Sequence, residues 1–348
     1  MNGSLGRDRV WNDHIWTEID KAVREEVGRV RVAQKVLPST VVNNVLPVSM
    51  NRAVPFGGKE SPGEPVDDVF QPFFEISTEF ILTQAQVEGE ESLHLALSRA
   101  RMAASALANA EDTILFLGPG FDLPGVNVTN YGAIPPGFVD EAAVHYLRAK
   151  KDPDLAKRFR FSDVKEAELD YVGKIIGAVS DGMGLLNSRG QPGPYALFLS
   201  PDRYAQSFAP AEKDHLSGPG DGINRIATGG FNMVSSLAVD NLKPWLDKER
   251  KKESKTFLTV VGTHRNLPPD ISDIGLLVSL GGEPVKIILG SDATTAFTHT
   301  EAGKYHFRVF ERIQMVVRDG TAFQILKFPA NKGSSNAGKS QGGNAAGK

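Results

Sequence analysis

The first strong pattern of apolar and polar positions runs from residue 11 to residue 30. Apolar side chains recur there every three or four residues, and charged side chains fill most of the positions between them. This spacing predicts an amphipathic helix, whose apolar face either covers the core of its own chain or receives a partner. The pattern leaves both alternatives open. The apolar members are Trp11, Ile15, Ile19, Val23, Val27 and Val30.

The chain changes character over residues 37–72, where proline and glycine recur at short intervals. Proline lacks a backbone donor and glycine is flexible, so both favour extended or looping chain over helix. A loop of this length without secondary structure is uncommon inside a compact domain. We therefore expect the segment to leave its own domain and pack against a neighbouring copy of the chain.

A strand and a long helix are predicted next. Aromatic and β-branched residues over 73–82 favour a strand. The alanine-rich stretch 90–110 carries an apolar stripe and has high helix propensity. At about 1.5 Å per residue, the helix forms a rod roughly 30 Å long. The glycine-proline-glycine sequence at 118–120 ends this unit.

The remainder of the chain has a mixed helix and strand pattern. The Asp319-Gly320 dipeptide lies between two strand-like runs and predicts a hairpin turn. The charged run 248–255 is typical of a solvated surface, and 217–222 is typical of a loop. The expected helices lie near 140–155 and 162–186, and the expected strands at 195–199, 257–261, 274–280, 285–289, 305–317 and 322–328.

Composition narrows the class of protein. The chain has 348 residues, a formal net charge of -3 and no cysteine, which excludes disulfides and thiolate chemistry. The N-terminus carries charges where a signal peptide needs an apolar stretch, and no apolar run approaches the roughly 20 residues needed to span a bilayer. Residues 329–348 lack large apolar side chains, so we expect a flexible tail. These features predict an intracellular protein outside the membrane.

No common catalytic or ligand-binding motif is present. Ser200 lacks the flanking glycines of a nucleophile elbow, and the glycine-rich stretch 218–222 lacks the lysine of a phosphate loop. The histidines show no helical metal-binding spacing. They are His14, His94, His145, His215, His264, His299 and His306. We therefore expect no catalytic, cofactor-binding or metal-binding residues, and a protein that is not an enzyme.

A specific resemblance begins at residue 193. The stretch 193–201, followed by Arg203 and Tyr204, resembles the signature strand of the encapsulin family, also known as linocin-type proteins. Further blocks at 16–20, 80–83, 100–118, 289–292 and 305–309 follow the order of that family, so that the resemblance covers about 11–328. The signature residues, to which we assign a structural role, are Gly193, Pro194, Tyr195, Leu199, Ser200 and Pro201.

The resemblance implies an α+β protein with the Hong Kong 97 phage capsid-like fold. Its parts are expected as an N-terminal arm and helix at 1–36, an extended loop at 37–72, a peripheral domain with the long spine helix, an axial domain and a flexible tail at 329–348. The peripheral domain is assigned to 73–130 and 301–328, and the axial domain to 131–300. The chain is longer than typical encapsulins, chiefly around 136–170 and 240–256.

The function that the resemblance implies is structural. Copies of the chain would assemble, in multiples of about sixty, into a hollow icosahedral shell. In an encapsulin-type nanocompartment, a cytoplasmic shell encloses a cargo enzyme, and Ile15, Ile19 and Val23 would face the interior and receive a short cargo peptide. The alternative is the major capsid protein of a tailed bacteriophage, which encloses DNA in a virion. An enzyme of unrelated class is the remaining possibility.

Overall fold

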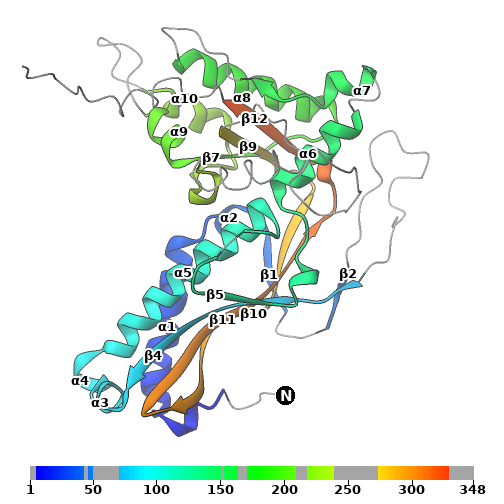
Figure 1. Ribbon diagram of the computed structural model, residues 1–348. Coiled ribbons are helices and arrows are strands. Elements are labelled where there is room, and N and C mark those ends of the chain that lie inside the picture. The colour runs from blue at the N-terminus through cyan, green and yellow to red at the C-terminus, as the bar shows by residue number, and fades with distance from the viewer. Residues whose placement is uncertain are drawn as a thin grey trace, which may run out of the picture.

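The structure is a computed structural model that describes residues 5–42, 46–49, 70–121, 123–149, 153–163, 171–208, 218–238 and 273–328. Two five-stranded sheets organise it, and helices pack on both (Figure 1). The first sheet, with helices α1 and α5, forms an elongated body, and the second sheet lies with its own helices at one end of that body (Figure 1).

The first sheet has the strand order β1-β10-β11-β4-β5. All neighbours are antiparallel except β1, which runs parallel to β10. Helices α1 and α5 pack against each other and against this sheet. The strands are β1 (Ser39–Val41), β4 (Phe74–Thr83), β5 (Val126–Thr129), β10 (Val285–Glu301) and β11 (Lys304–Val317), and the helices are α1 (Asp13–Val30) and α5 (Leu95–Leu117).

The second sheet has the strand order β6-β12-β9-β7-β8. Its strands are β6 (Ser162–Asp163), β7 (Tyr195–Leu199), β8 (Gly230–Met233), β9 (Asp273–Ser279) and β12 (Phe323–Phe328). Its associated helices are α6 (Phe138–Ala149), α7 (Pro153–Arg158), α8 (Tyr171–Ser188), α9 (Pro201–Gln206) and α10 (Pro219–Ile226). The short elements elsewhere are β2 (Val48–Ser49), β3 (Phe70–Gln71), α2 (Ala33–Val36), α3 (Gln84–Glu88) and α4 (Glu90–Leu93).

The C-terminal end of α5 joins the two sheets. The Phe116 ring lies 5.2 Å from the Phe138 ring of α6 and 5.0 Å from the Phe198 ring of β7, each pair edge to face. The chain leaves α5 at Gly118, which has a φ of 77°. A Cβ at Gly137 would overlap the backbone of Gly118, so this crossing requires glycine. The two sheets therefore share one continuous core.

Most of the predicted elements are confirmed. The helix predicted at 11–30 is α1, the strand at 73–82 is β4, and the long helix continues to Leu117 as α5. The strands predicted at 195–199, 274–280, 305–317 and 322–328 are β7, β9, β11 and β12. The helix predicted near 140–155 is present as α6 and α7.

Three predictions are wrong in detail. Residues 162–163 form β6 rather than the start of a helix, and α8 begins at Tyr171. The predicted loop 217–222 contains the start of α10, because Pro219 suits the first turn of a helix and Gly220 lets the Phe208 ring approach closely. The strand predicted at 285–289 extends to Glu301 as β10.

The predicted Asp319-Gly320 hairpin is also wrong. Strands β11 and β12 lie in different sheets, and Asp319 instead accepts hydrogen bonds from the backbone and hydroxyl of Thr321, where a 3-10 turn redirects the chain. The hairpin in the structure joins β10 to β11 through Ala302 and Gly303.

The membership of strands in the two sheets does not follow the residue ranges predicted for the peripheral and axial domains. Strand β12 lies in the second sheet although 301–328 was assigned to the peripheral domain, and β10 lies in the first sheet although its residues were assigned to the axial domain. The domain boundaries themselves stay a prediction. The charged run 248–255, the strand expected at 257–261, most of the loop 37–72 and the tail 329–348 lie outside the described residues.

Candidate functional site

Helix α1 is the element for which the sequence predicts a role in binding. Asn12 caps it, because its side-chain oxygen accepts a hydrogen bond from the Ile15 amide at 3.1 Å. The apolar face of the helix packs on α5 and β10. Ile15, Ile19 and Val23 are 8%, 1% and 0% exposed, so this face belongs mainly to the core of its own chain.

A hollow of about 310 Å³ remains between α1 and the start of α5. Buried Ile15 and Ile19 contribute apolar surface to it, and half-buried Leu97 lies across from them. Val23 does not line it. Hollows of this size accommodate small apolar groups with a few polar contacts around them. The lining residues are His14, Ile15, Glu18, Ile19, Glu90, Glu91, His94 and Leu97.

The wall formed by α4 and α5 is held in place by Glu90. Its carboxylate is 3% exposed and accepts hydrogen bonds from the amides of Ala96 at 2.6 Å and Leu97 at 3.0 Å. The amides in the first turn of α5, which have no partner within the helix, thereby donate to a carboxylate. Its negative charge is favourable at the positive end of the helix dipole. His94 adopts a left-handed conformation with a φ of 49° between the two helices. Exposed Glu18 and Glu91 then leave a partly acidic rim.

An arm that precedes α1 is fastened to the first sheet. Arg7 forms an ion pair with Asp20 at 2.7 Å and donates to the Thr295 carbonyl at 2.6 Å. Asp20 in turn accepts from the Thr295 amide at 3.1 Å, and the Trp16 indole donates to the Arg7 carbonyl at 3.0 Å. This network holds α1 in register with β10. The sequence pattern does not indicate it, because Arg7 and Asp20 are both more than 270 residues from Thr295.

A second buried network lies at the other end of α1. Asp112 accepts hydrogen bonds from the Val32 and Ala33 amides at 2.8 and 2.9 Å, and the fully buried Glu311 lies 3.4 Å from Arg31. Burial raises the pKa of Asp112 to about 6 and that of Glu311 to about 8. Burial and the nearby Glu311 carboxyl also raise the pKa of Glu111.

The signature strand has a structural place in the second sheet. Strand β7 lies between β8 and β9, and Leu199 and Ser200 are buried. The Tyr195 hydroxyl donates to the Gln191 carbonyl, and the Pro194 carbonyl accepts from the Leu280 amide. Gly193 precedes the strand, and Pro201 begins α9. These residues lie apart from the hollow beside α1, whose lining comes from the first body.

The structure brings together one group that the sequence interpretation separated. The side chains of His299, Glu301 and His306 meet at the tip of the β10–β11 hairpin, with their ligand atoms within 4.8 Å of one another. Their spacing in the sequence is not helical, and only a hairpin at Ala302-Gly303 makes them neighbours. A strand prediction that extended past residue 289 would have revealed the pair.

Residues 11–134 match the family model Linocin_M18, described as an encapsulating protein for peroxidase. No curated protein matches the chain. Among the described residues, no helix has the length and apolar character needed to cross a membrane.

Solved structures similar to this chain are shell proteins. A virus-like particle from Pyrococcus furiosus matches with a TM-score of 0.54 at 13% identity, covering 91% of this chain and all of that chain. The capsid of Myoviridae phage XM1 matches with a TM-score of 0.46 at 10% identity, over 86% of this chain and 92% of that one. The capsid of a native GTA particle matches with a TM-score of 0.48 at 14% identity. This match covers 86% of this chain and 90% of that chain.

The family match includes α1 and α5, which line the hollow, and β4 of the first sheet. The structural match to the virus-like particle extends over nearly the whole chain. The chain therefore has the Hong Kong 97 capsid-like fold, and its residues 11–134 are similar to the encapsulin family.

Proposed function

We propose that this chain is the subunit of a closed icosahedral shell that encloses a cargo protein, an encapsulin-type nanocompartment in the cytoplasm. The observation that carries the proposal is the match of residues 11–134 to a family of encapsulating proteins, within a chain that has a shell-subunit fold. Electron microscopy of the purified protein tests it. Uniform hollow particles are expected, and a chain that sediments as a folded single subunit at high concentration contradicts it.

The described parts of the predicted extended segment support assembly. Leu46 and Phe70 are 68% and 60% exposed in a single copy, and Val41 and Val42 are also exposed. Large apolar side chains clustered along one segment mark an interaction surface. The symmetry of a closed shell covers the same surface on every copy, because each subunit occupies an equivalent position. We infer that these side chains are buried between neighbouring subunits.

A charge at residue 70 is expected to prevent assembly. Burying a phenylalanine side chain stabilises a contact by about 1.5–3 kcal/mol. Phe70→Glu removes this stabilisation from every subunit contact and adds the cost of removing water from a carboxylate. We expect Phe70→Glu to remain a folded subunit that forms no particles, measured by analytical ultracentrifugation. Lys157→Glu, a charge change at a highly exposed position of α7, serves as the control and should assemble normally. Particles of normal yield from Phe70→Glu contradict this interface.

The hollow beside α1 supports a cargo peptide as its occupant. Its floor offers Ile15 and Ile19, and its rim carries the carboxylates of Glu18 and Glu91. This combination suits a short segment with one or two apolar side chains and a basic residue beside them. Val23, which we expected to take part, is 0% exposed and lies outside the hollow, so we restrict the proposed contact to Ile15 and Ile19.

Leu97→Glu is expected to release the cargo while the shell stays intact. Leu97 is half-buried and lines the hollow, so a carboxylate there opposes apolar contact without entering the main core. Shells purified from the native host would be treated with protease and their contents identified by mass spectrometry. We expect Leu97→Glu to reduce the enclosed protein at least about tenfold, equivalent to 1.4 kcal/mol.

Ser98→Glu is the matched control, since it places the same charge on the exposed side of α5 one residue away. It should keep its cargo. Equal retention by both variants contradicts the assignment of the hollow.

Packaged DNA is the alternative content of such a shell. A surface that lines a DNA-filled interior gains affinity from lysine and arginine that neutralise phosphates. The exposed side of α1 instead balances Asp13, Glu18 and Glu25 against Lys21 and Arg24, with Arg29 paired to Glu26. Nuclease-protected DNA of uniform length inside purified particles would favour the phage capsid, and an enclosed protein without such DNA favours the nanocompartment.

A further inference from the structure

The longest hairpin of the structure ends in a group of side chains that no part of the proposed shell function uses. Strands β10 and β11 are joined by Ala302 and Gly303, whose φ values are 48° and 74°. A two-residue turn with both φ values positive matches the twist of antiparallel strands and fixes their register. In this register His299 lies directly opposite His306, and Glu301 is opposite Lys304.

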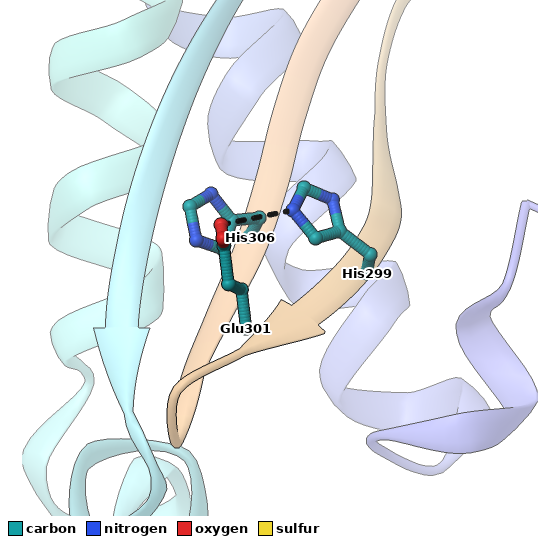
Figure 2. A group of neighbouring side chains, drawn as sticks. All are labelled: His299, Glu301 and His306. Atoms are coloured by element: carbon teal, nitrogen blue, oxygen red, sulfur yellow. Dashed lines mark ion pairs between the residues drawn. The ribbon is translucent and has the colours of Figure 1, made fainter.

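Three potential ligand groups converge at this tip. The imidazole rings of His299 and His306 are stacked, with centroids 4.4 Å apart and planes inclined by 13°. The Glu301 carboxylate lies 3.8 Å from Nε2 of His299. Figure 2 shows Glu301 reaching from the end of β10 toward both rings. One ligand atom from each residue lies within 4.8 Å of the other two.

The group lies on the side of the sheet that faces away from the core. Phe307 is 0% exposed and packs among the aromatic rings beneath α1, so its neighbour His306 points to the opposite face. The His299 and Glu301 side chains are 53% and 73% exposed. Among the described residues, neither imidazole makes a hydrogen bond, and burial in a core does not account for their placement.

We propose that His299, Glu301 and His306 bind a divalent transition-metal ion of the zinc class. Two imidazole nitrogens and one carboxylate oxygen are ligands that Zn²⁺, Ni²⁺ and Cu²⁺ accept, whereas Ca²⁺ and Mg²⁺ require oxygen ligands. Zinc binds these groups at about 2.0–2.2 Å, which places tetrahedral ligand atoms about 3.3 Å apart. Exposed His299 and Glu301 and half-buried His306 would reach this spacing by rotation about their side-chain bonds.

Three protein ligands leave a fourth position of the ion for water. The bound ion links β10 to β11 beside the turn and stiffens the end of the hairpin. The site does not depend on which cargo the shell encloses.

Titration of the full-length metal-free protein with ZnCl₂ tests the site, with isothermal calorimetry as the readout. One ion per chain is expected. His299→Asn and His306→Asn should each raise the dissociation constant at least about tenfold, equivalent to 1.4 kcal/mol, and Glu301→Gln should raise it by a smaller factor. Titration with Co²⁺ gives a second readout, since the visible absorption of a tetrahedral ion reports its coordination directly.

Thr298→Asn is the matched control, because it introduces the same side chain at an exposed position of the same strand. It should bind zinc as the unchanged protein does. All four substitutions are at the exposed tip, and unchanged circular dichroism and thermal midpoints in metal-free buffer verify that the variants fold. Absence of zinc binding, or binding that both histidine variants retain at full affinity, overturns the proposal.

Discussion

Replacing Phe307 with alanine is expected to lower the free energy of unfolding by about 3–5 kcal/mol. The Phe307 ring is fully buried, stacks on Trp11 at a centroid distance of 4.9 Å and on Phe80 at 5.1 Å, and lies 6.1 Å from Trp16. Its removal leaves a cavity between the sheet and α1, because rings held on several sides cannot collapse into the space. Denaturant unfolding followed by tryptophan fluorescence measures the loss.

The same substitution should loosen α1, since Trp11 and Trp16 attach that helix to the sheet through Phe307. Limited proteolysis is therefore expected to cut the N-terminal segment faster in Phe307→Ala. Phe208→Ala is the matched control, because the Phe208 ring is 44% exposed although it also contacts two aromatic rings. A control variant that loses as much stability as Phe307→Ala shows that burial does not decide the effect.

The second large effect is a loss of stability as the pH rises. The carboxyls of Glu111 and Glu311 are fully buried, and burial together with the negative charges near them raises their pKa values, which favours a proton on these groups. Burial raises the pKa of Glu311 to about 8 from an ordinary value of 4.5, and that of Asp112 to about 6 from 3.8. Arg31 opposes these shifts and does not cancel them.

Stability falls with rising pH because the unfolded chain releases these protons at lower pH than the folded protein does. In the unfolded chain these groups ionise near their ordinary pKa values, whereas the folded protein keeps them protonated at higher pH. The unfolded state therefore binds fewer protons between about pH 4 and pH 8, and stability falls across this interval. Each group contributes at most about 1.4 kcal/mol per pH unit. The full contribution of these groups to the free energy of unfolding is present below about pH 4 and is lost above about pH 8.

Glu311→Gln provides the test, because glutamine keeps the shape of the side chain and cannot ionise. Thermal midpoints measured from pH 5 to pH 9 should fall less steeply in this variant, which should exceed the unchanged protein in stability at pH 9. Glu75→Gln is the comparison, since Glu75 forms ion pairs with Arg308 and Arg312 near the surface of the same sheet. It should lower stability through the loss of these ion pairs. Parallel pH profiles for Glu311→Gln and the unchanged protein contradict the assignment.

The local pattern of apolar and polar residues was sufficient to predict elements whose side chains alternate between core and solvent. Helix α1 and the second half of strand β4 follow this pattern, and α5 was recognisable from its length and its alanine content. The last part of β10 was missed because its exposed residues from Thr298 onward are polar and resemble a loop. Their pairing with β11 makes them a strand, and such pairing depends on a partner rather than on propensity.

The candidate site was predicted in part. The apolar spacing of α1 indicated Ile15, Ile19 and Val23 alike, whereas only Ile15 and Ile19 line the hollow and Val23 lies wholly in the core. Their contact with a cargo peptide stays a prediction. The opposite wall comes from α4 and α5, and the Glu90 carboxylate that shapes it acts on amides six and seven residues away. A single-helix pattern contains no information about which of its apolar residues another helix will cover.

The order and type of most elements, the absence of cysteine chemistry and the resemblance to shell proteins were determined by the amino-acid sequence alone, because each depends on residue identity or on short-range periodicity. Only the tertiary structure decided which strands share a sheet, which carboxyls lose their water and which three side chains meet at the β10–β11 tip. These features depend on contacts between residues far apart in the chain, whose free energies arise only when the whole core has formed.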